Sequence, residues 1–226
     1  MREIVLDTET TGFRPAEGHR IVEIGCVELL NHVPTGTTFQ RYINPERDMP
    51  EGAFQVHGLS AEFLAGHPVF AEIVADFQDF IGDDRLVIHN AEFDMGFLNA
   101  ELKTLGMPPL PPTRAIDTVQ IARKKFPGAQ ASLDALCRRF GIDSSARTKH
   151  GALLDAELLA EVYLELVGGR QPGFGLDQRS EAAIAAAGRI TADRPVRPPR
   201  PHAAGADELA AHQALVDRLK NPIWKA

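Results

Sequence analysis

Short apolar runs dominate the first part of the chain and predict β-strands. Residues 3–7, 20–30 and 37–43 are rich in β-branched and aliphatic side chains. A turn-rich segment around Gly12 joins the first two runs. The chain is therefore expected to open with a meander of three strands.

Helical spacing follows. Apolar side chains recur every three or four residues between Pro68, a typical first helical residue, and Gly82, which can end a helix. A buried strand is expected at 86–88, after which Asn90 can cap a helix over 91–105. Further helices are predicted at 117–125, 132–140 and 153–167. Strands followed by mixed strands and helices indicate an α/β or α+β sheet domain.

The character of the chain changes after residue 169. Residues 170–205 are rich in proline, glycine, alanine and arginine and are predicted to be a flexible linker. A helical pattern returns in the segment 206–226, but an isolated helix of that length is marginal in water. This segment is either a frayed tail or a region that orders on a partner. The second is favoured because an exposed aromatic anchor needs a reason. Ordering on a partner would bury Leu215, Leu219, Ile223 and Trp224.

Composition limits the class of protein. The 226 residues, 44% of them hydrophobic, can bury one core besides the tail. The apolar run near the N-terminus is too short for a signal peptide, and no stretch approaches the roughly 20 apolar residues of a membrane span. Cys26 and Cys137 lie in apolar patterns, so buried free thiols in a reducing cytoplasm are expected. The net charge of −7 argues against a broad basic nucleic-acid surface, but not against a small site where bound cations supply positive charge.

Carboxylates in three places carry the candidate chemistry. Asp7 and Glu9 are two residues apart on a strand and project from one face; a solvated strand end is the alternative to a metal site. Asp94 lies in the first turn of the helix after the 86–88 strand, where it can also simply favour the helix dipole. Asp155 shares the apolar face of the last large helix, and a core-facing carboxylate calls for a cation.

His150 lies in the loop that enters the same helix. A lone histidine is more often structural, but beside carboxylates an imidazole is the usual group that takes a proton from water. Four carboxylates and one histidine, with few cysteines, fit Mg²⁺ or Mn²⁺ better than zinc. Two such ions would stabilise the attacking and leaving oxygens of a phosphodiester, so phosphoryl transfer to water is the expected reaction class.

Three segments, in order, resemble the exonuclease motifs of the DEDDh family: Asp-Thr-Glu-Thr-Thr-Gly at 7–12, His-Asn-Ala-Glu-Phe-Asp at 89–94 and His-Gly-Ala-Leu-Leu-Asp at 150–155. Further similarity to the proofreading epsilon subunits of bacterial DNA polymerase III extends over 1–169. The resemblance implies a ribonuclease H-like α/β fold with a mixed central sheet flanked by helices, plus a flexible C-terminal tail. It also implies a 3′–5′ exonuclease that removes mismatched 3′-terminal nucleotides from DNA by a two-metal-ion mechanism.

The same resemblance assigns roles to individual residues. It implies that two Mg²⁺ (or Mn²⁺) ions are held by Asp7, Glu9, Asp94 and Asp155, while His150 acts as general base. It further implies that the terminal nucleotide is contacted by Asp7, Glu9, Thr10, His57 and Asp155.

Other positions match the family less closely. The family has an acidic nucleotide contact five residues before His57, where this chain has Gly52; a one-residue shift of the loop would restore it with Glu51. Asp117 either orients His150 or caps a helix. Phe93 is expected in the core, whereas Phe13 can stack on a base.

The tail resembles the family's polymerase tether. The resemblance implies that 206–226, with Trp224, binds the polymerase III alpha subunit. Residues 171–176, which begin with Gln171 and end with Leu176, look like a weak peptide for the beta sliding clamp. The motifs alone leave two other functions open, a stand-alone exoribonuclease and a catalytically idle scaffold. The linker and Trp224 favour the polymerase-bound enzyme over the first, and the complete set of carboxylates and histidine disfavours the second.

Overall fold

The structure is a computed structural model that describes residues 1–145, 147, 149–169 and 203–220. The chain separates into two compact units, Met1–Gly173 and Phe174–Ala226, which we describe individually. The predicted clamp peptide at 171–176 and the predicted polymerase contact Trp224 lie outside the described residues. Within the described part, no helix is long and apolar enough to cross a membrane.

The first unit is built on a mixed five-stranded sheet in the order β3-β2-β1-β4-β5. The three N-terminal strands pair antiparallel, whereas β4 pairs parallel with β1 and β5 parallel with β4. The strands are β1 (Arg2–Thr10), β2 (Ile21–Leu30), β3 (Val33–Tyr42), β4 (Arg85–Ile88) and β5 (Ala115–Asp117). The predicted strand meander and the mixed sheet are thus confirmed, with β3 beginning earlier than the expected residue 37.

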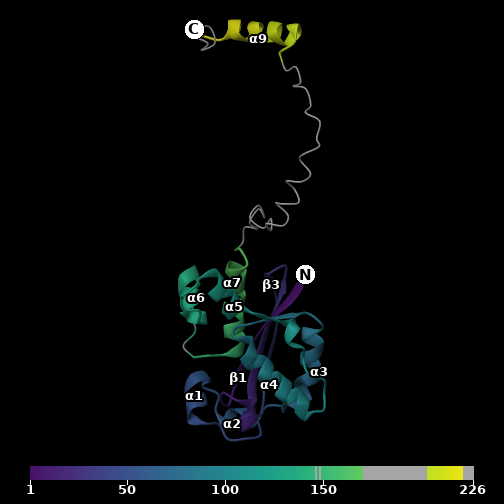
Figure 1. The fold of residues 1–226 in the computed structure, drawn as a ribbon, viewed down its shortest axis with the longest axis vertical. Helices are drawn as coiled ribbons and strands as arrows, with labels where there is room; N and C mark the ends of the chain where they lie inside the picture. The colour runs from purple at the N-terminus through teal and green to yellow at the C-terminus, as the bar shows by residue number, and fades with distance from the viewer. Residues whose placement is uncertain (146, 148, 170–202, 221–226) are drawn as a thin grey trace, which may run out of the picture. The chain divides into compact units, whose positions relative to one another are not determined.

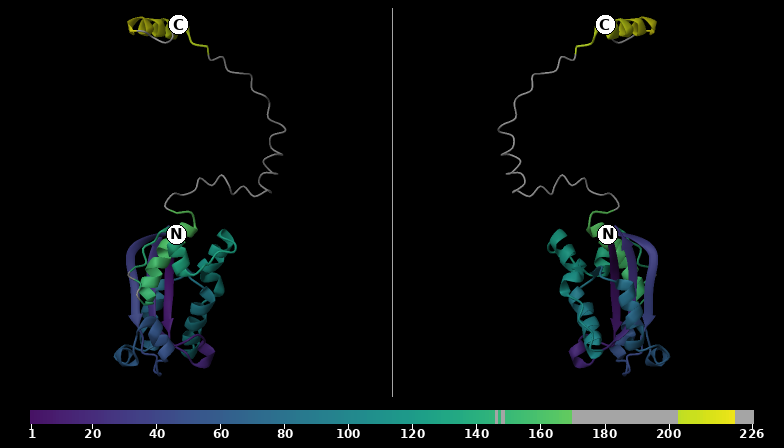
Figure 2. Two further views of the ribbon diagram at one scale, coloured as in Figure 1. Left: turned by 90° about the vertical axis from the view of Figure 1, so that its left-hand side faces the viewer. Right: turned by 90° about the vertical axis from the view of Figure 1, so that its right-hand side faces the viewer.

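Helices cover both faces of this sheet (Figures 1 and 2). One hydrophobic cluster joins the sheet to α3 (Phe70–Ile81) and α4 (Ala91–Thr104). The other cluster joins it to α5 (Thr118–Lys125), α6 (Leu133–Phe140) and α7 (Ala152–Leu166). The remaining short elements of this unit are η1 (Pro15–Glu17), α1 (Glu51–His57), α2 (Ala61–Leu64) and η2 (Pro112–Arg114).

Strand β1 lies between the two clusters and is buried on both faces. Ile4 and Leu6 pack toward α3 and α4, whereas Val5 packs toward α7. Because side chains alternate along a strand, Asp7 and Glu9 continue the face of Val5 and point toward α7. The position of the two carboxylates therefore follows from the burial pattern of the residues before them.

Several local predictions are confirmed and two are wrong. Gly82 ends α3 by donating its N–H to Gln78, and Cys26 and Cys137 are buried free thiols. Pro68 is not the first helical residue, because α3 begins after Val69 in the N-cap position. Asn90 precedes α4 as predicted, but its side chain makes no capping hydrogen bond. Instead its backbone is left-handed, at φ 68°, and turns the chain from β4 into the helix.

The second unit contains α9 (Ala206–Arg218), so the predicted helical pattern there is confirmed. Leu209, Leu215 and Leu219 are exposed, whereas Val216 is buried. The helix thus carries exposed apolar side chains.

Candidate active site

A pocket of about 650 Å³ lies where β1 and β4 end. It gathers residues from all three exonuclease motifs, although Asp7 of the first and Asp155 of the last are far apart in the chain. The predicted site residues that line it are Asp7, Glu9, Thr10, His57, Asp94, His150 and Asp155. The predicted convergence of the three motifs is therefore observed.

Asp94 reaches the pocket from the side of the sheet opposite Asp7. Its Oδ1 accepts hydrogen bonds from the backbone N–H of Thr8 at 3.0 Å and from the Thr8 hydroxyl at 2.7 Å. These bonds fix the carboxylate beside β1, where it is only 3% exposed. Asp94 therefore does more than complement the dipole of α4.

Asp155 reaches the pocket because α7 begins unusually close to β2. Gly25 of β2 lies opposite Asp7, and a Cβ at Gly25 would overlap the backbone of Ala152 and Leu153. The N–H of Ala152 donates to Glu23 Oε2 at 3.1 Å, so β2 also supplies an acceptor for the start of the helix. The first turn of α7, with Asp155, is thereby held beside β1.

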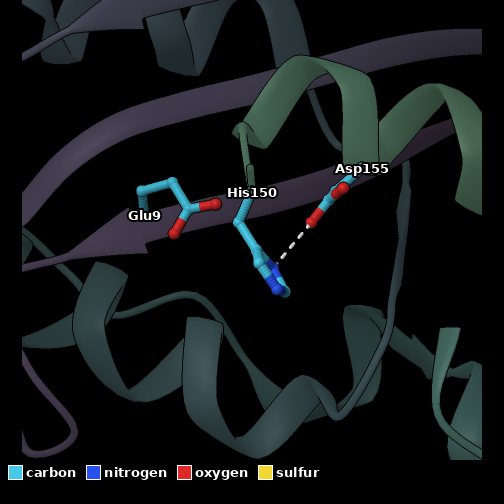
Figure 3. Close-up of side chains that lie close together, drawn as sticks. All are labelled: Glu9, His150 and Asp155. Atoms are coloured by element: carbon cyan, nitrogen blue, oxygen red, sulfur yellow. Dashed lines mark ion pairs between the residues drawn. The ribbon is translucent and has the colours of Figure 1, made fainter. Parts of the chain in front are cut away.

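Glu9, His150 and Asp155 face one another across a small space (Figure 3). Each offers one ligand atom, and the three atoms lie within 4.8 Å of one another. His150 Nδ1 lies 3.2 Å from Asp155 Oδ2. The imidazole is partly exposed, so it is accessible from the pocket.

Burial and mutual repulsion hold these carboxylates in an unusual state. The pKa of Asp7 is raised well above its ordinary value by burial, followed by repulsion from Asp94, Glu9 and Asp155. Burial is also the main cause that raises the pKa of Glu9 to about 8 and that of Asp94 to about 7. Such groups ionise readily only beside a cation, so the oxygen-rich donor set fits a hard divalent metal ion.

One guanidinium partly compensates this negative charge. Arg147 binds both carboxylate oxygens of Asp155, at 2.5 and 2.6 Å, and Asp134 Oδ1 at 2.5 Å. Its Nη2 also lies 2.8 Å from His150 Nδ1. Arg147 is not among the residues predicted from the sequence, because a cationic residue three positions before His150 is too common a feature to indicate a role.

His57 is almost fully buried in the pocket wall. Its Nδ1 accepts from the backbone N–H of Leu59 at 3.0 Å, and burial lowers the pKa of its imidazole. Among the described residues its Nε2 makes no hydrogen bond of ordinary geometry, but the backbone of Thr10 is close enough to raise the pKa of the ring against the effect of burial. His57 therefore lies beside Thr10, the other residue expected to contact the nucleotide, in the wall of the pocket.

The structure does not bring every candidate to this pocket. Glu51 begins α1, is exposed and accepts from Gln55 at 3.0 Å; its neighbour Gly52 lines the pocket instead. Asp117 caps α5 by accepting from the N–H of Val119 at 2.9 Å, which confirms its structural interpretation.

The two aromatic candidates differ in their surroundings. Phe93 packs against the core and lies 4.9 Å from the ring of Phe97, which confirms the core prediction, although it also lines the pocket. Phe13 lines the pocket while remaining 84% exposed. Its ring is thus available to a base, as stacking requires.

Comparisons with known proteins agree with this geometry. The family model described as Exonuclease (RNase_T) matches residues 4–163. The DNA polymerase III subunit epsilon of Rickettsia felis is 56% identical over 183 residues, which cover 80% of each chain. The DNA polymerase III subunit epsilon of Escherichia coli (strain K12) is 44% identical over 241 residues, which cover 100% of this chain and 98% of the relative.

Solved structures share the fold. The nuclease domain of 3′hExo, a DEDDh family member bound to rAMP, has a TM-score of 0.63 at 22% identity, covering 74% of this chain and 91% of that one. Exonuclease X in complex with 5′ overhanging duplex DNA has a TM-score of 0.57 at 23% identity, covering 73% and 90%.

The fold and the carboxylate pocket define a DEDDh-type 3′–5′ exonuclease, and the predicted ribonuclease H-like fold is confirmed. Within that class, the chain belongs to the family of DNA polymerase III epsilon subunits. It is a proofreading 3′–5′ exonuclease, not an idle scaffold.

Proposed function

We propose that this exonuclease removes mismatched 3′-terminal nucleotides from DNA with two Mg²⁺ or Mn²⁺ ions held by its four motif carboxylates. The observation that supports this most directly is the pocket itself: buried oxygen donors with raised pKa values and too little positive charge. When bound, such ions stabilise the attacking and leaving oxygens of a phosphodiester. The ligands proposed are Asp7, Glu9, Asp94 and Asp155.

Side chains around these four ligands are proposed to act as general base and to bind the nucleotide. His150 is the proposed general base: it is the exposed imidazole beside Asp155 and can accept a proton from water at a ring nitrogen. His57 and the backbone near Thr10 are proposed to hold the terminal nucleotide, because the two lie together in the wall of the pocket. Glu51 is proposed for the family's acidic nucleotide contact, a role that needs the α1 loop to shift by one residue.

The deciding experiment is degradation of a 3′-mismatched primer–template DNA by the full-length protein, with Mg²⁺ and with EDTA. Stepwise shortening from the 3′ end that needs Mg²⁺ is expected. Shortening that continues in EDTA would contradict the metal site. A matched RNA oligonucleotide in parallel separates a DNA enzyme from an exoribonuclease, because the 2′-hydroxyl is read by contacts around the site.

We further propose that 206–226, with Trp224, binds the polymerase III alpha subunit and that 171–176 binds the beta sliding clamp in the bacterial cytoplasm, at the nucleoid. The exposed apolar side chains of α9 and the family to which the chain belongs support the first contact. Trp224→Ala is expected to weaken binding to alpha, measured by surface plasmon resonance. Gln171→Ala with Leu176→Ala is expected to abolish binding to the clamp, and unchanged affinity would remove that proposal.

A further inference from the structure

Arg147 occupies the two groups on which the proposed hydrolysis depends. Its Nε and Nη2 bind both oxygens of Asp155, and Nη2 also points to His150 Nδ1. The same Nδ1 lies 3.2 Å from Asp155 Oδ2, so whether it accepts from Arg147 or donates to Asp155 depends on the tautomer of the imidazole. One cation therefore binds the Asp155 carboxylate and lies against the imidazole of His150.

This arrangement is not the reacting one. In the tautomer whose Nδ1 accepts from Arg147, the other ring nitrogen carries the proton and no lone pair is left for water. Both oxygens of Asp155 are likewise taken by the guanidinium at charge-assisted distances. A metal ion at Asp155 would therefore compete with Arg147 for these two oxygens.

A second carboxylate, Asp134, can hold the guanidinium of Arg147 when it no longer binds Asp155. Its Nη1 already binds Asp134 Oδ1 at 2.5 Å, from the first turn of α6. Asp134 is half-exposed on the pocket rim, whereas Asp155 is buried. Among the described residues that line the pocket, Arg147 is the only lysine or arginine, beside five carboxylates. A phosphate entering this pocket meets one permanent cation.

We propose that Arg147 exchanges partners during the reaction cycle. In the metal-free protein it is the counter-ion of Asp155; once a divalent cation takes Asp155, the guanidinium stays anchored to Asp134 and binds the phosphate of the terminal nucleotide. This inference rests on the metal site proposed above. The competing view is that Arg147 is a permanent brace that orients Asp155 in every state.

Metal affinity without DNA separates the two views, because they predict opposite changes. Mn²⁺ is titrated into the full-length protein by isothermal calorimetry, comparing wild type, Arg147→Gln and the control Arg138→Gln. Arg138 is exposed in the last turn of α6, so its removal changes the net charge equally but leaves the pocket intact. Arg147→Gln is expected to bind Mn²⁺ about tenfold more tightly, since a competing cation is gone. The control is expected to match wild type.

Equal or weaker Mn²⁺ binding by Arg147→Gln would overturn the exchange and favour the brace. Absence of Mn²⁺ binding by the wild type would instead overturn the metal site itself. Circular dichroism verifies that each variant is folded.

A second titration tests the phosphate contact. At saturating Mn²⁺, thymidine 5′-monophosphate is expected to bind Arg147→Gln about tenfold more weakly than wild type, as loss of one charge-assisted hydrogen bond requires. Asp134→Asn keeps Arg147 but removes its anchor, so it is expected to weaken the monophosphate without tightening Mn²⁺. Wild-type affinity for the monophosphate in both variants would overturn the proposal.

Discussion

Both ends of β1 carry carboxylates on the same face, but the groups that surround these carboxylates differ between the two ends. At the N-terminal end, Glu3 is fully buried, accepts from the Tyr163 hydroxyl at 2.9 Å and lies 2.6 Å from His32 Nδ1. At the other end, Asp7 and Glu9 face mainly other carboxylates. The sequence pattern alone makes the three residues look alike.

The comparison shows that burial of a carboxylate does not by itself mark an active site. Glu3 joins the β2–β3 turn to α7 through His32 and Tyr163, whose rings meet edge to face at 5.5 Å. Burial and this hydrogen bond raise the pKa of Tyr163 and keep it a donor. Asp7 and Glu9 differ from Glu3 because their neighbours are mainly other carboxylates. A bound metal ion would supply the positive charge that these neighbours do not.

The largest expected effect comes from removing a carboxylate at the functional end. Asp7→Ala is expected to lower exonuclease activity by about 10³-fold or more, because it removes a proposed metal ligand. The melting temperature in EDTA is expected to stay or rise, because repulsion is relieved. The measurements are release of a 3′-terminal labelled nucleotide and thermal unfolding. Substantial activity in this variant would defeat the metal assignment.

His150→Ala tests the base rather than the metal. Cleavage is expected to slow by about 10²–10⁴-fold, the usual contribution of a general base. Single-turnover cleavage with excess enzyme measures this step, and Mn²⁺ titration serves as the control, since the four carboxylates remain. A wild-type rate at saturating metal would remove His150 from the chemistry.

The opposite result is expected for Glu3→Ala. The Tyr163 hydroxyl is left buried without its acceptor, which costs about 1–3 kcal/mol of unfolding free energy. Urea denaturation measures this loss. Exonuclease activity at a temperature where the variant is folded is expected to equal that of wild type. A large loss of activity in folded protein would mean that the two ends of β1 are not independent.

The smallest effect is a dependence of stability on pH. The pKa values of Glu9 and Asp94 rise to about 8 and about 7 in the folded protein, from ordinary values of 4.5 and 3.8. The folded state therefore binds more protons, and the associated stability is present at low pH and lost as pH rises through 7 and 8. Thermal unfolding in EDTA is expected to show a melting temperature that falls by a few degrees between about pH 5 and 9.

Two controls sharpen this measurement. Glu9→Gln is expected to flatten the part of the fall near pH 8. Saturating Mg²⁺ is expected to flatten it further, because a bound cation stabilises the ionised carboxylates. If neither the Glu9→Gln substitution nor saturating Mg²⁺ alters the dependence of the melting temperature on pH, these carboxylates do not govern it.

Much of the fold and site was predictable because it depends on local patterns. The apolar run at residues 3–7 predicted β1. Apolar side chains at helical spacing, ended by Gly82, predicted α3. Helices α1 and α2 were not predicted, because each is shorter than the stretch of sequence over which helical periodicity can be detected. Arg147 was missed for another reason: its contacts to Asp155 and Asp134 exist only after α6, α7 and the loop between them have packed.

Gly25 shows how narrow the space beside Asp7 is. A methyl group there would meet the backbone of Ala152 and Leu153, so α7 would have to shift and carry Asp155 with it. The change would alter no reacting group. For a proofreading enzyme, the expected consequence of a displaced Asp155 in a dividing cell is a raised rate of spontaneous mutation.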